Sequence, residues 1–225
     1  MKNNFELIYE NNQYYPLEKE KKDYLQFLKL HRIYPESKLQ SLFSGITKNH
    51  SFGKCPNCLY CINQYFFNFF IDQIIYIDGI DFRGKFTDIL KQNLAYANNI
   101  KVECQNCGRD VNIIEKATII KLPKILIFTL QRSMNQHFSK ICIMPDLFLD
   151  MKSYIDNSIK VNNTTYELYA INIKMGENDK DGHEICRVKR KGIWYEINDT
   201  EIREIQNPCQ KFNGCIYGLF YNQLK

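Results

Sequence analysis

The sequence predicts an α+β fold built mainly on antiparallel β-sheet, with a pair of hairpin tips that are clamped by metal. Three observations support this prediction. Residues 166–202 show the composition and turn signals of three consecutive strands. Two Cys-x-x-Cys motifs, which begin at Cys55 and Cys104, indicate knuckle turns far apart in the chain. Helical periodicity is found only in short segments, around 17–30 and 87–97.

Length, hydrophobic runs and cysteine content limit the class of protein. A chain of 225 residues can bury a sizeable core, as one large domain or two small ones. Its start lacks the apolar region of a secretory signal, and its most apolar run, 65–77, is interrupted by Asn68, Asp72 and Gln73, so we expect no membrane span. Nine cysteines without such a signal favour a reducing compartment, cytoplasmic and/or nuclear.

The net charge of +5 is mild, so it permits contact with nucleic acid without requiring it. The basic cluster at 187–191 is predicted to be a solvated strand edge, where lysine also discourages aggregation.

The first predicted helix, 17–30, follows a polar, frayed terminus at 1–15 and ends before Pro35. Its apolar face consists of Tyr24, Phe27, Leu28 and His31. The second helix, 87–97, has an apolar stripe made of Phe86, Ile89, Leu90, Leu94 and Ala97.

The two knuckles supply four thiols, those of Cys55, Cys58, Cys104 and Cys107, and this set suits tetrahedral Zn²⁺. Gly108 fits the tight turn that lets backbone amides face the sulfurs. The alternative is that all four are reduced structural thiols. Cys61 adds a third step of the same spacing, but no further cysteine follows closely, so we expect it to be a buried thiol.

Strands are predicted around the knuckles and after them. Those around the knuckles, 46–52, 64–77, 100–103 and 111–120, form a metal-tipped finger together with the second helix. Those that follow are 122–130, 138–144 and 216–222, the last in the central sheet, while 147–154 forms either a turn of helix or a strand.

A hairpin in the last third of the chain carries a candidate catalytic group. Strands 184–189 and 193–197 flank Lys191-Gly192, where glycine suits a turn with positive φ. Pairing outward from this turn brings His183 to within a residue or two of Asn198 and Asp199. An amide and a carboxylate beside a histidine can orient a general base. The alternative is a polar strand end that happens to contain a histidine.

Motifs along 39–221 occur in the order seen in a known family, the ubiquitin-specific proteases, which the chain resembles. The matching residues are Leu42-Phe43-Ser44-Gly45, the two Cys-x-x-Cys pairs, Leu122-Pro123 with Leu126, Leu130 and Arg132, Tyr166 with Leu168, Ala170 and Gly176, Gly182-His183, Trp194-Tyr195 with Ile197-Asn198-Asp199, and Tyr217-Gly218-Leu219-Phe220-Tyr221. Each motif is weak alone, but the ordered set is highly specific.

The resemblance implies a papain-like cysteine peptidase fold with a palm sheet and zinc-tipped fingers. It implies a helical N-terminal remnant at 1–36 and a partial catalytic domain at 37–225, with fingers at about 46–120 and palm at about 121–225. By resemblance, His183 is the general base, Asn198 orients it, Asp199 supports the site, and the four knuckle cysteines hold a structural zinc. The implied partners are ubiquitin or ubiquitinated proteins, which the family cleaves by cysteine-type hydrolysis.

The chain also departs from the family pattern. Ser133, Lys174 and Glu184 replace residues that are usually Phe, His and Tyr. No cysteine precedes Cys55, so the family's nucleophile box is absent, and we expect the thumb half to be largely missing and the chain to be inactive alone. Cys186 is predicted to face away from His183, and the remaining thiols, Cys142, Cys209 and Cys215, have no local activating signature.

Three functions therefore remain open. The first is a deubiquitinase domain without its nucleophile. The second is a non-catalytic ubiquitin-binding module of the pseudo-protease type. The third, a zinc-dependent nucleic-acid binder, is disfavoured because the basic residues are dispersed and do not alternate with aromatics on one face.

Overall fold

The structure is a computed structural model that describes residues 18–30, 37–77, 84–94, 97–134, 137–138, 142–176, 182–210 and 214–224. In chain order its elements are α2 (Glu18–Leu30), α3 (Lys38–Phe43), β1 (Gly45–Lys54), β2 (Cys61–Phe70), β3 (Asp72–Tyr76), β4 (Gly84–Lys85), α4 (Phe86–Leu94), β5 (Ala97–Glu103), β6 (Asp110–Lys121), β7 (Ile125–Gln131), β8 (Ser133–Met134), β9 (His137–Phe138), β10 (Ile143–Met144), β11 (Phe148–Asp150), the 3₁₀ helix η1 (Lys152–Tyr154), β12 (Thr165–Met175), β13 (His183–Arg190), β14 (Ile193–Asn198), β15 (Glu201–Ile205) and β16 (Cys215–Gln223).

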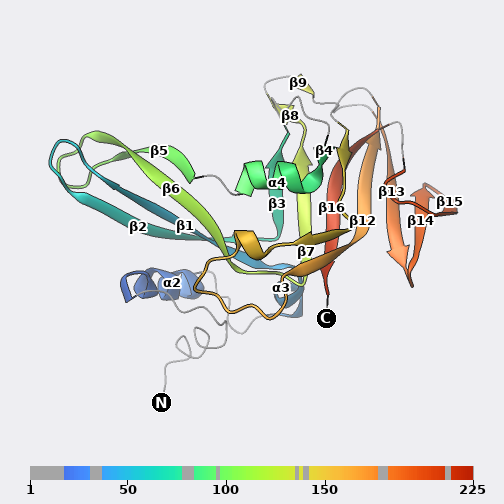
Figure 1. Cartoon of the computed structure of the whole chain (residues 1–225), viewed down its shortest axis with the longest axis horizontal. Helices are drawn as coiled ribbons and strands as arrows, with labels where there is room; N and C mark the ends of the chain where they lie inside the picture. The colour runs from blue at the N-terminus through green and yellow to red at the C-terminus, as the bar shows by residue number, and fades with distance from the viewer. Residues whose placement is uncertain are drawn as a thin grey trace, which may run out of the picture. The chain divides into compact units, whose positions relative to one another are not determined.

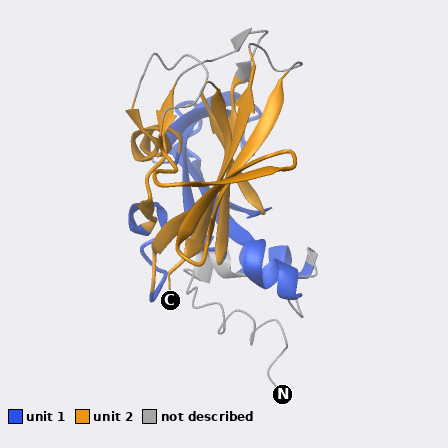
Figure 2. Ribbon diagram, turned by 90° about the vertical axis from the view of Figure 1, so that its right-hand side faces the viewer, with its two compact units in different colours: residues 1–70, 94–123, 152–162 blue, residues 71–93, 124–151, 163–225 orange. Residues whose placement is uncertain are grey.

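The chain divides into two compact units, each made of discontinuous segments (Figure 2). Unit 1 comprises 1–70, 94–123 and 152–162, and unit 2 comprises 71–93, 124–151 and 163–225. The domain boundaries predicted from the sequence, at about 36 and 120, differ from the limits of these units and stay predictions.

Unit 1 is built on a four-stranded antiparallel sheet in the order β2-β1-β6-β5, the long narrow sheet in Figure 1. The predicted finger strands at 46–52, 100–103 and 111–120 are confirmed in β1, β5 and β6. At the base of this sheet α2 packs through Tyr24, Phe27 and Leu28, all buried, as its helical periodicity predicted. They form one apolar cluster with Ile46, Phe67 and Ile120. His31, Pro35 and the terminus at 1–15 lie outside the described residues.

The single long strand predicted over 64–77 is wrong. The chain bends at Ile71 and forms two strands, β2 and β3, that belong to different sheets. β2 pairs antiparallel with β1, whereas β3 pairs parallel with β7. Apolar periodicity cannot reveal such a change of partner, because it identifies extended segments and not the strands with which they pair.

Unit 2 is built on an eight-stranded sheet whose main path is β15-β14-β13-β12-β16-β7-β3, with β11 paired to β12 (Figure 1). All its pairs except β3–β7 are antiparallel. The mostly antiparallel sheet predicted from the sequence is therefore confirmed, as are β7 after Pro123 and the aromatic β16 inside the sheet.

The helix α4 packs on this sheet through Phe86, whose ring lies 4.9 Å from that of Phe128 on β7 and 6.4 Å from that of Tyr221 on β16. Phe86, Ile89 and Leu90 are buried, in agreement with the predicted stripe. The helix ends at Leu94, so its predicted extension to Ala97 is wrong: Ala97 begins β5, where it pairs with Lys116. Strand pairing overrides the good helix propensity of alanine.

The strands predicted in 166–197 are confirmed as β12, β13 and β14, and the turn between the last two has positive φ at both Lys191 and Gly192. A fourth strand, β15, was missed. Because β14 and β15 lie outside β13, the cluster at 187–191 is not a sheet edge as predicted, and Arg187 is buried.

Between β7 and β12 the described residues form short elements. The predicted strand 138–144 begins in β9 and ends in β10, and 139–141 lie outside the described residues. Segment 147–154, predicted as a helical turn or a strand, forms both, β11 and then η1. None of the helices in the described ranges combines the length and apolar character that a membrane crossing needs.

Candidate active site and metal centre

The four knuckle cysteines converge at one point of unit 1, as the sequence predicted. The sulfurs of Cys55, Cys58, Cys104 and Cys107 all lie within 4.8 Å of one another. The Sγ atoms of Cys58 and Cys104 are 3.6 Å apart, and those of Cys55 and Cys107 are 3.7 Å apart. Four sulfurs bonded at about 2.3 Å to one tetrahedral ion lie about 3.8 Å from each other. The donor set and its spacing therefore fit a structural zinc ion.

The two knuckles have the same backbone geometry. Leu59 N donates to Cys55 O at 2.9 Å, and Gly108 N donates to Cys104 O at 2.8 Å. Both donor residues have positive φ, 61° at Leu59 and 68° at Gly108. The glycine was anticipated from sequence, but the leucine in the equivalent position was not, since its side chain disfavours this conformation. Metal ligation can offset that cost.

Polar contacts affect the four sulfurs differently. The backbone hydrogen bond with Arg109 lowers the pKa of Cys107, but burial and the neighbouring cysteines outweigh it and raise that pKa to about 12. The Asn106 side chain and the Tyr60 backbone hydrogen-bond to Cys58 and lower its pKa to about 6. Arg109 Nη1 donates to Asn57 Oδ1 at 3.1 Å and so ties one knuckle to the other. Cys61, predicted to be buried, is instead exposed and is not part of the cluster.

The predicted catalytic residues come together in unit 2. His183 Nε2 and Asn198 Oδ1 are 2.5 Å apart, and Asp199 Oδ2 is 3.9 Å from the same nitrogen. Since an amide oxygen can only accept, Nε2 carries the hydrogen in this contact and Nδ1 retains its lone pair. His183, whose side chain is 46% exposed, can therefore take a proton through Nδ1.

Strand register explains the contact. Cys186 pairs with Ile197 and Arg187 with Glu196, so the open end of the β13–β14 hairpin brings His183 near Asn198. Glu184 faces the opposite side of β13, where its Oε2 accepts from Asn172 Nδ2 at 3.5 Å. The unusual carboxylate beside the histidine is thus directed away from it.

The other thiols of unit 2 do not resemble activated nucleophiles. Burial raises the pKa of both Cys186 and Cys209, whose sulfurs contact the carbonyls of Arg187 and Pro145 at 3.8 and 3.6 Å. Cys215 is buried, and Cys142 is exposed.

A cavity of about 390 Å³ adjoins Asn198 and is lined also by Glu196, Glu201, Ile202 and Arg203. Glu196 and its partner Arg187 were missed as site residues. A signal existed: in the predicted strand 193–197 Glu196 shares a face with Trp194, and a carboxylate on a face with a large aromatic residue needs a cation as partner once it is buried.

The family model described as ubiquitin carboxyl-terminal hydrolase matches residues 16–221, nearly the whole chain. This chain belongs to the ubiquitin carboxyl-terminal hydrolase family. Ubiquitin carboxyl-terminal hydrolase 48 of Danio rerio is 28% identical over 129 residues, covering 53% of this chain and 12% of that protein. Ubiquitin carboxyl-terminal hydrolase Usp2 of Drosophila melanogaster is 31% identical over 127 residues, covering 53% of this chain and 13% of that protein.

Solved structures of the family have the same fold. The SAGA Ubp8/Sgf11/Sus1/Sgf73 DUB module bound to ubiquitin aldehyde matches with a TM-score of 0.68 at 23% identity, over 91% of this chain and 49% of that chain. A SAGA DUB module with Ubp8 bound to monoubiquitin matches with a TM-score of 0.64 at 22% identity, over 91% and 48%. The predicted family and its α+β fold are confirmed, and the chain spans about half of the solved chains it matches.

Proposed function

We propose that this chain forms the part of a cysteine-type deubiquitinase that carries the general base and binds ubiquitin. The contact between His183 Nε2 and Asn198 Oδ1 supports the proposal most directly, because it leaves Nδ1 ready to accept a proton. In this chemistry a thiolate attacks the carbonyl carbon of an isopeptide or thioester bond. His183 takes the thiol proton and returns it to the leaving group, and water then releases ubiquitin.

Asn198 and Asp199 have supporting roles in this proposal. Asn198 holds the imidazole through its amide oxygen, and the Asp199 carboxylate at 3.9 Å can stabilise the imidazolium that forms during proton transfer. The four knuckle cysteines would hold a zinc ion that clamps the tips of the finger sheet, and the ion takes no part in the reaction.

Ubiquitin is the proposed partner. Two of the solved structures that share this fold are described as bound to ubiquitin aldehyde and to monoubiquitin. The finger sheet and the main sheet are both present here, so we propose that this chain also binds ubiquitin. The proposed compartments are the cytoplasm and/or the nucleus, where thiols remain reduced.

We propose that none of the thiols of unit 2 is the nucleophile. Four of the nine cysteines converge in the knuckles, and burial raises the pKa of Cys186 and Cys209. We therefore expect negligible hydrolysis of a ubiquitin–fluorophore amide by this chain alone, since removing a nucleophile abolishes nearly all catalysis. An intact finger sheet without a thiol beside the base also favours a second candidate, a non-catalytic ubiquitin-binding module.

Two measurements test these candidates. Titration of fluorescently labelled ubiquitin should show saturable binding by the wild-type chain and by His183→Ala alike. Absence of saturation into the high micromolar range would overturn both candidates. Hydrolysis of the ubiquitin–fluorophore amide that disappears in His183→Ala would favour the enzyme, whereas hydrolysis that survives this substitution would show that the base is assigned wrongly.

A further inference from the structure

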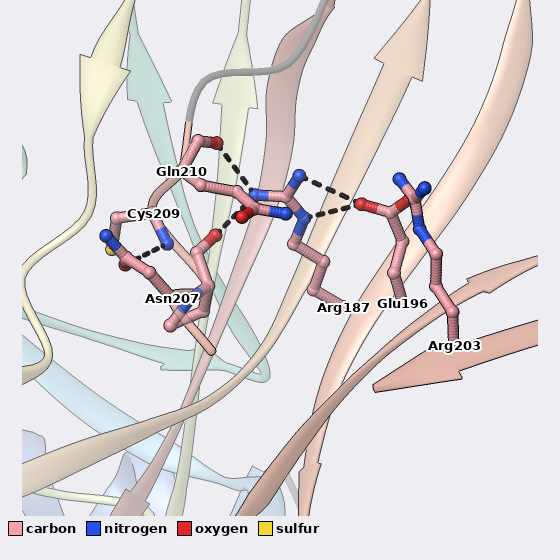
Figure 3. A network of polar contacts seen from close by, with 7 residues as sticks. Arg187, Glu196, Arg203, Asn207, Cys209 and Gln210 are labelled. Atoms are coloured by element: carbon pink, nitrogen blue, oxygen red, sulfur yellow. Dashed lines mark hydrogen bonds and ion pairs between the residues drawn. The ribbon is translucent and has the colours of Figure 1, made fainter. Parts of the chain in front are cut away.

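We propose that Arg187 is a positioning residue for His183: it clamps β13 to β14 and to segment 207–210, and so keeps the imidazole against Asn198. The inference rests on the proposed function, because it concerns the same base. Figure 3 shows the Arg187 guanidinium between Glu196 on one side and segment 207–210 on the other.

The first half of the clamp joins the two strands that carry the base and its orienting residue. Arg187 and Glu196 lie directly opposite each other, and their side chains are only 2% and 5% exposed. Arg187 Nε donates to Glu196 Oε2 at 2.9 Å, and Arg187 Nη2 forms an ion pair with the same oxygen at 2.9 Å. A charge-assisted hydrogen bond of this kind, between two buried side chains, holds the two strands in register.

The second half joins β13 to the segment that precedes β16. Arg187 Nη1 donates to the carbonyls of Pro208 and Gln210, at 2.6 and 2.9 Å. The segment is itself organised by Asn207, whose Oδ1 accepts from Cys209 N at 2.9 Å and whose carbonyl accepts from Gln210 N at 3.1 Å. A planar guanidinium can serve both directions at once, whereas a lysine ammonium cannot reproduce that fork.

Glu196 is held in its ionised form. Its other oxygen, Oε1, accepts from Arg203 Nε at 3.0 Å on the neighbouring strand β15. Burial alone would raise the pKa of Glu196, but the hydrogen bonds from Arg187 and Arg203 outweigh it and hold the pKa below its usual value. The clamp therefore spans β13, β14 and β15.

The location of the clamp connects it to the base. His183 and Arg187 share one face of β13, and Glu196 and Asn198 share the matching face of β14. The turn at Lys191-Gly192 lies on the far side of the clamp, so His183 and Asn198 lie at the end of the β13–β14 pair that this turn does not close. Each has another strand beside it, since His183 pairs with Met175 of β12 and Asn198 with Glu201 of β15. The clamp therefore limits shear between β13 and β14 at this end.

The test reads the His183 imidazole directly, by ¹⁵N NMR of the full chain labelled at histidine, with His183→Gln used for assignment. Asn198→Ala removes the acceptor and defines the shifts of a released imidazole. We expect Arg187→Met to move the His183 nitrogen shifts towards those of Asn198→Ala. We expect Arg187→Lys to fail to restore them.

A double variant distinguishes a loss of protein stability from a loss of His183 positioning. In the double variant Arg187→Met/Glu196→Leu no buried carboxylate loses its partner, so its melting temperature should exceed that of Arg187→Met. We expect its His183 shifts to remain those of the released imidazole. The matched control is Lys189→Met, on the same strand and face, whose 2.6 Å ion pair with Glu167 is partly exposed; it should leave His183 unchanged.

The outcomes distinguish this inference from the function it rests on. If Asn198→Ala leaves the His183 shifts unaltered, the pairing of base and orienting residue is wrong and the proposed function loses its main support. If Asn198→Ala moves them but neither Arg187→Met nor the double variant does, Arg187 is not a positioning residue and the proposed function stands.

Discussion

A single charged residue, Asp156, reinforces the short backbone pairing that joins the segment after η1 to β6, where Ile155 forms an isolated bridge with Ile119. Asp156, between η1 and β12, accepts from Lys48 Nζ at 2.6 Å and from Thr118 Oγ1 at 3.1 Å, and so ties its segment to β1 and β6. Burial alone would raise the Asp156 pKa, but hydrogen bonds from Lys48 and Ser158 lower it to about 2. Buried charges with such partners stabilise the fold only while they stay ionised.

This carboxylate gives unit 1 a defined sensitivity to acid. Because the folded-state pKa of Asp156 lies below the ordinary value of 3.8, its contribution is complete above about pH 4 and is lost as the pH falls towards about 2. Asp156→Asn should cost about 1–3 kcal/mol near neutral pH. Urea unfolding between about pH 5 and pH 2 should show a shallower loss of stability in the variant; equal slopes would contradict this assignment.

Gly45, in the Leu42–Gly45 motif, is required by packing. A Cβ built on Gly45 would lie 2.0 Å from Cζ of Phe70, its partner across β1 and β2. Phe70 is buried, so its ring has little room to move. We expect Gly45→Ala to lower the free energy of unfolding by about 1–3 kcal/mol.

The control for this prediction shortens the opposing side chain. Gly45→Ala should lower the free energy of unfolding less in the Phe70→Leu background than in the wild-type chain. Denaturant unfolding of the four proteins measures both differences. Simple additivity of the two substitutions would show that the clash is absent.

At the scale of elements, the Cys-x-x-Cys motifs predicted which thiols converge but not the environment of the neighbouring cysteine. Spacing alone predicted which four thiols converge, because a Cys-x-x-Cys turn points both sulfurs the same way. The prediction for Cys61 was only half right: it is outside the cluster, but β2 directs it to solvent and it is not buried.

Cys107, inside the cluster, and Cys61, outside it, provide a matched pair of variants. The wild-type chain should carry one zinc ion, measured by atomic emission. Cys107→Ser should reduce the zinc content and lower the melting temperature, because a tetrahedral site loses one of its ligands. Cys61→Ser should change neither. Equal zinc content in both variants would exclude the proposed ligand set.

Strand boundaries and strand partners were the features that the sequence predicted least accurately. Residues 64–77 have one alternating pattern, yet β2 and β3 belong to different sheets. β15 was missed because its central residues, Ile202, Arg203 and Glu204, are all exposed and show no buried face. Alternation reports that a residue is extended, but it does not report which strand it pairs with.

At the scale of the molecule, the described chain consists of two units with separate sheets. The candidate zinc site lies in unit 1, and His183 with Asn198 lies in unit 2. The candidate zinc site and the proposed general base therefore belong to different units.

Removal of zinc should affect amide hydrogen exchange in unit 1 but not in unit 2. Chelation should accelerate amide exchange in β1, β2, β5 and β6 near the knuckles, because their tips lose the ion that joins them. Amides of β12, β13 and β16 should keep their protection. Uniform acceleration across both units would show that the chain unfolds as one cooperative body when zinc is removed.

The amino-acid sequence was sufficient to predict the family, the mostly antiparallel fold, the four-thiol cluster and the proximity of His183 to Asn198. These features depend on local signals: a fixed spacing, a two-residue turn, an alternating pattern. Tertiary structure alone decided that segment 207–210 encloses the Arg187 guanidinium and that one apolar run serves two sheets. Both outcomes depend on which segments meet across long separations in the chain, and local propensity carries no information about that choice.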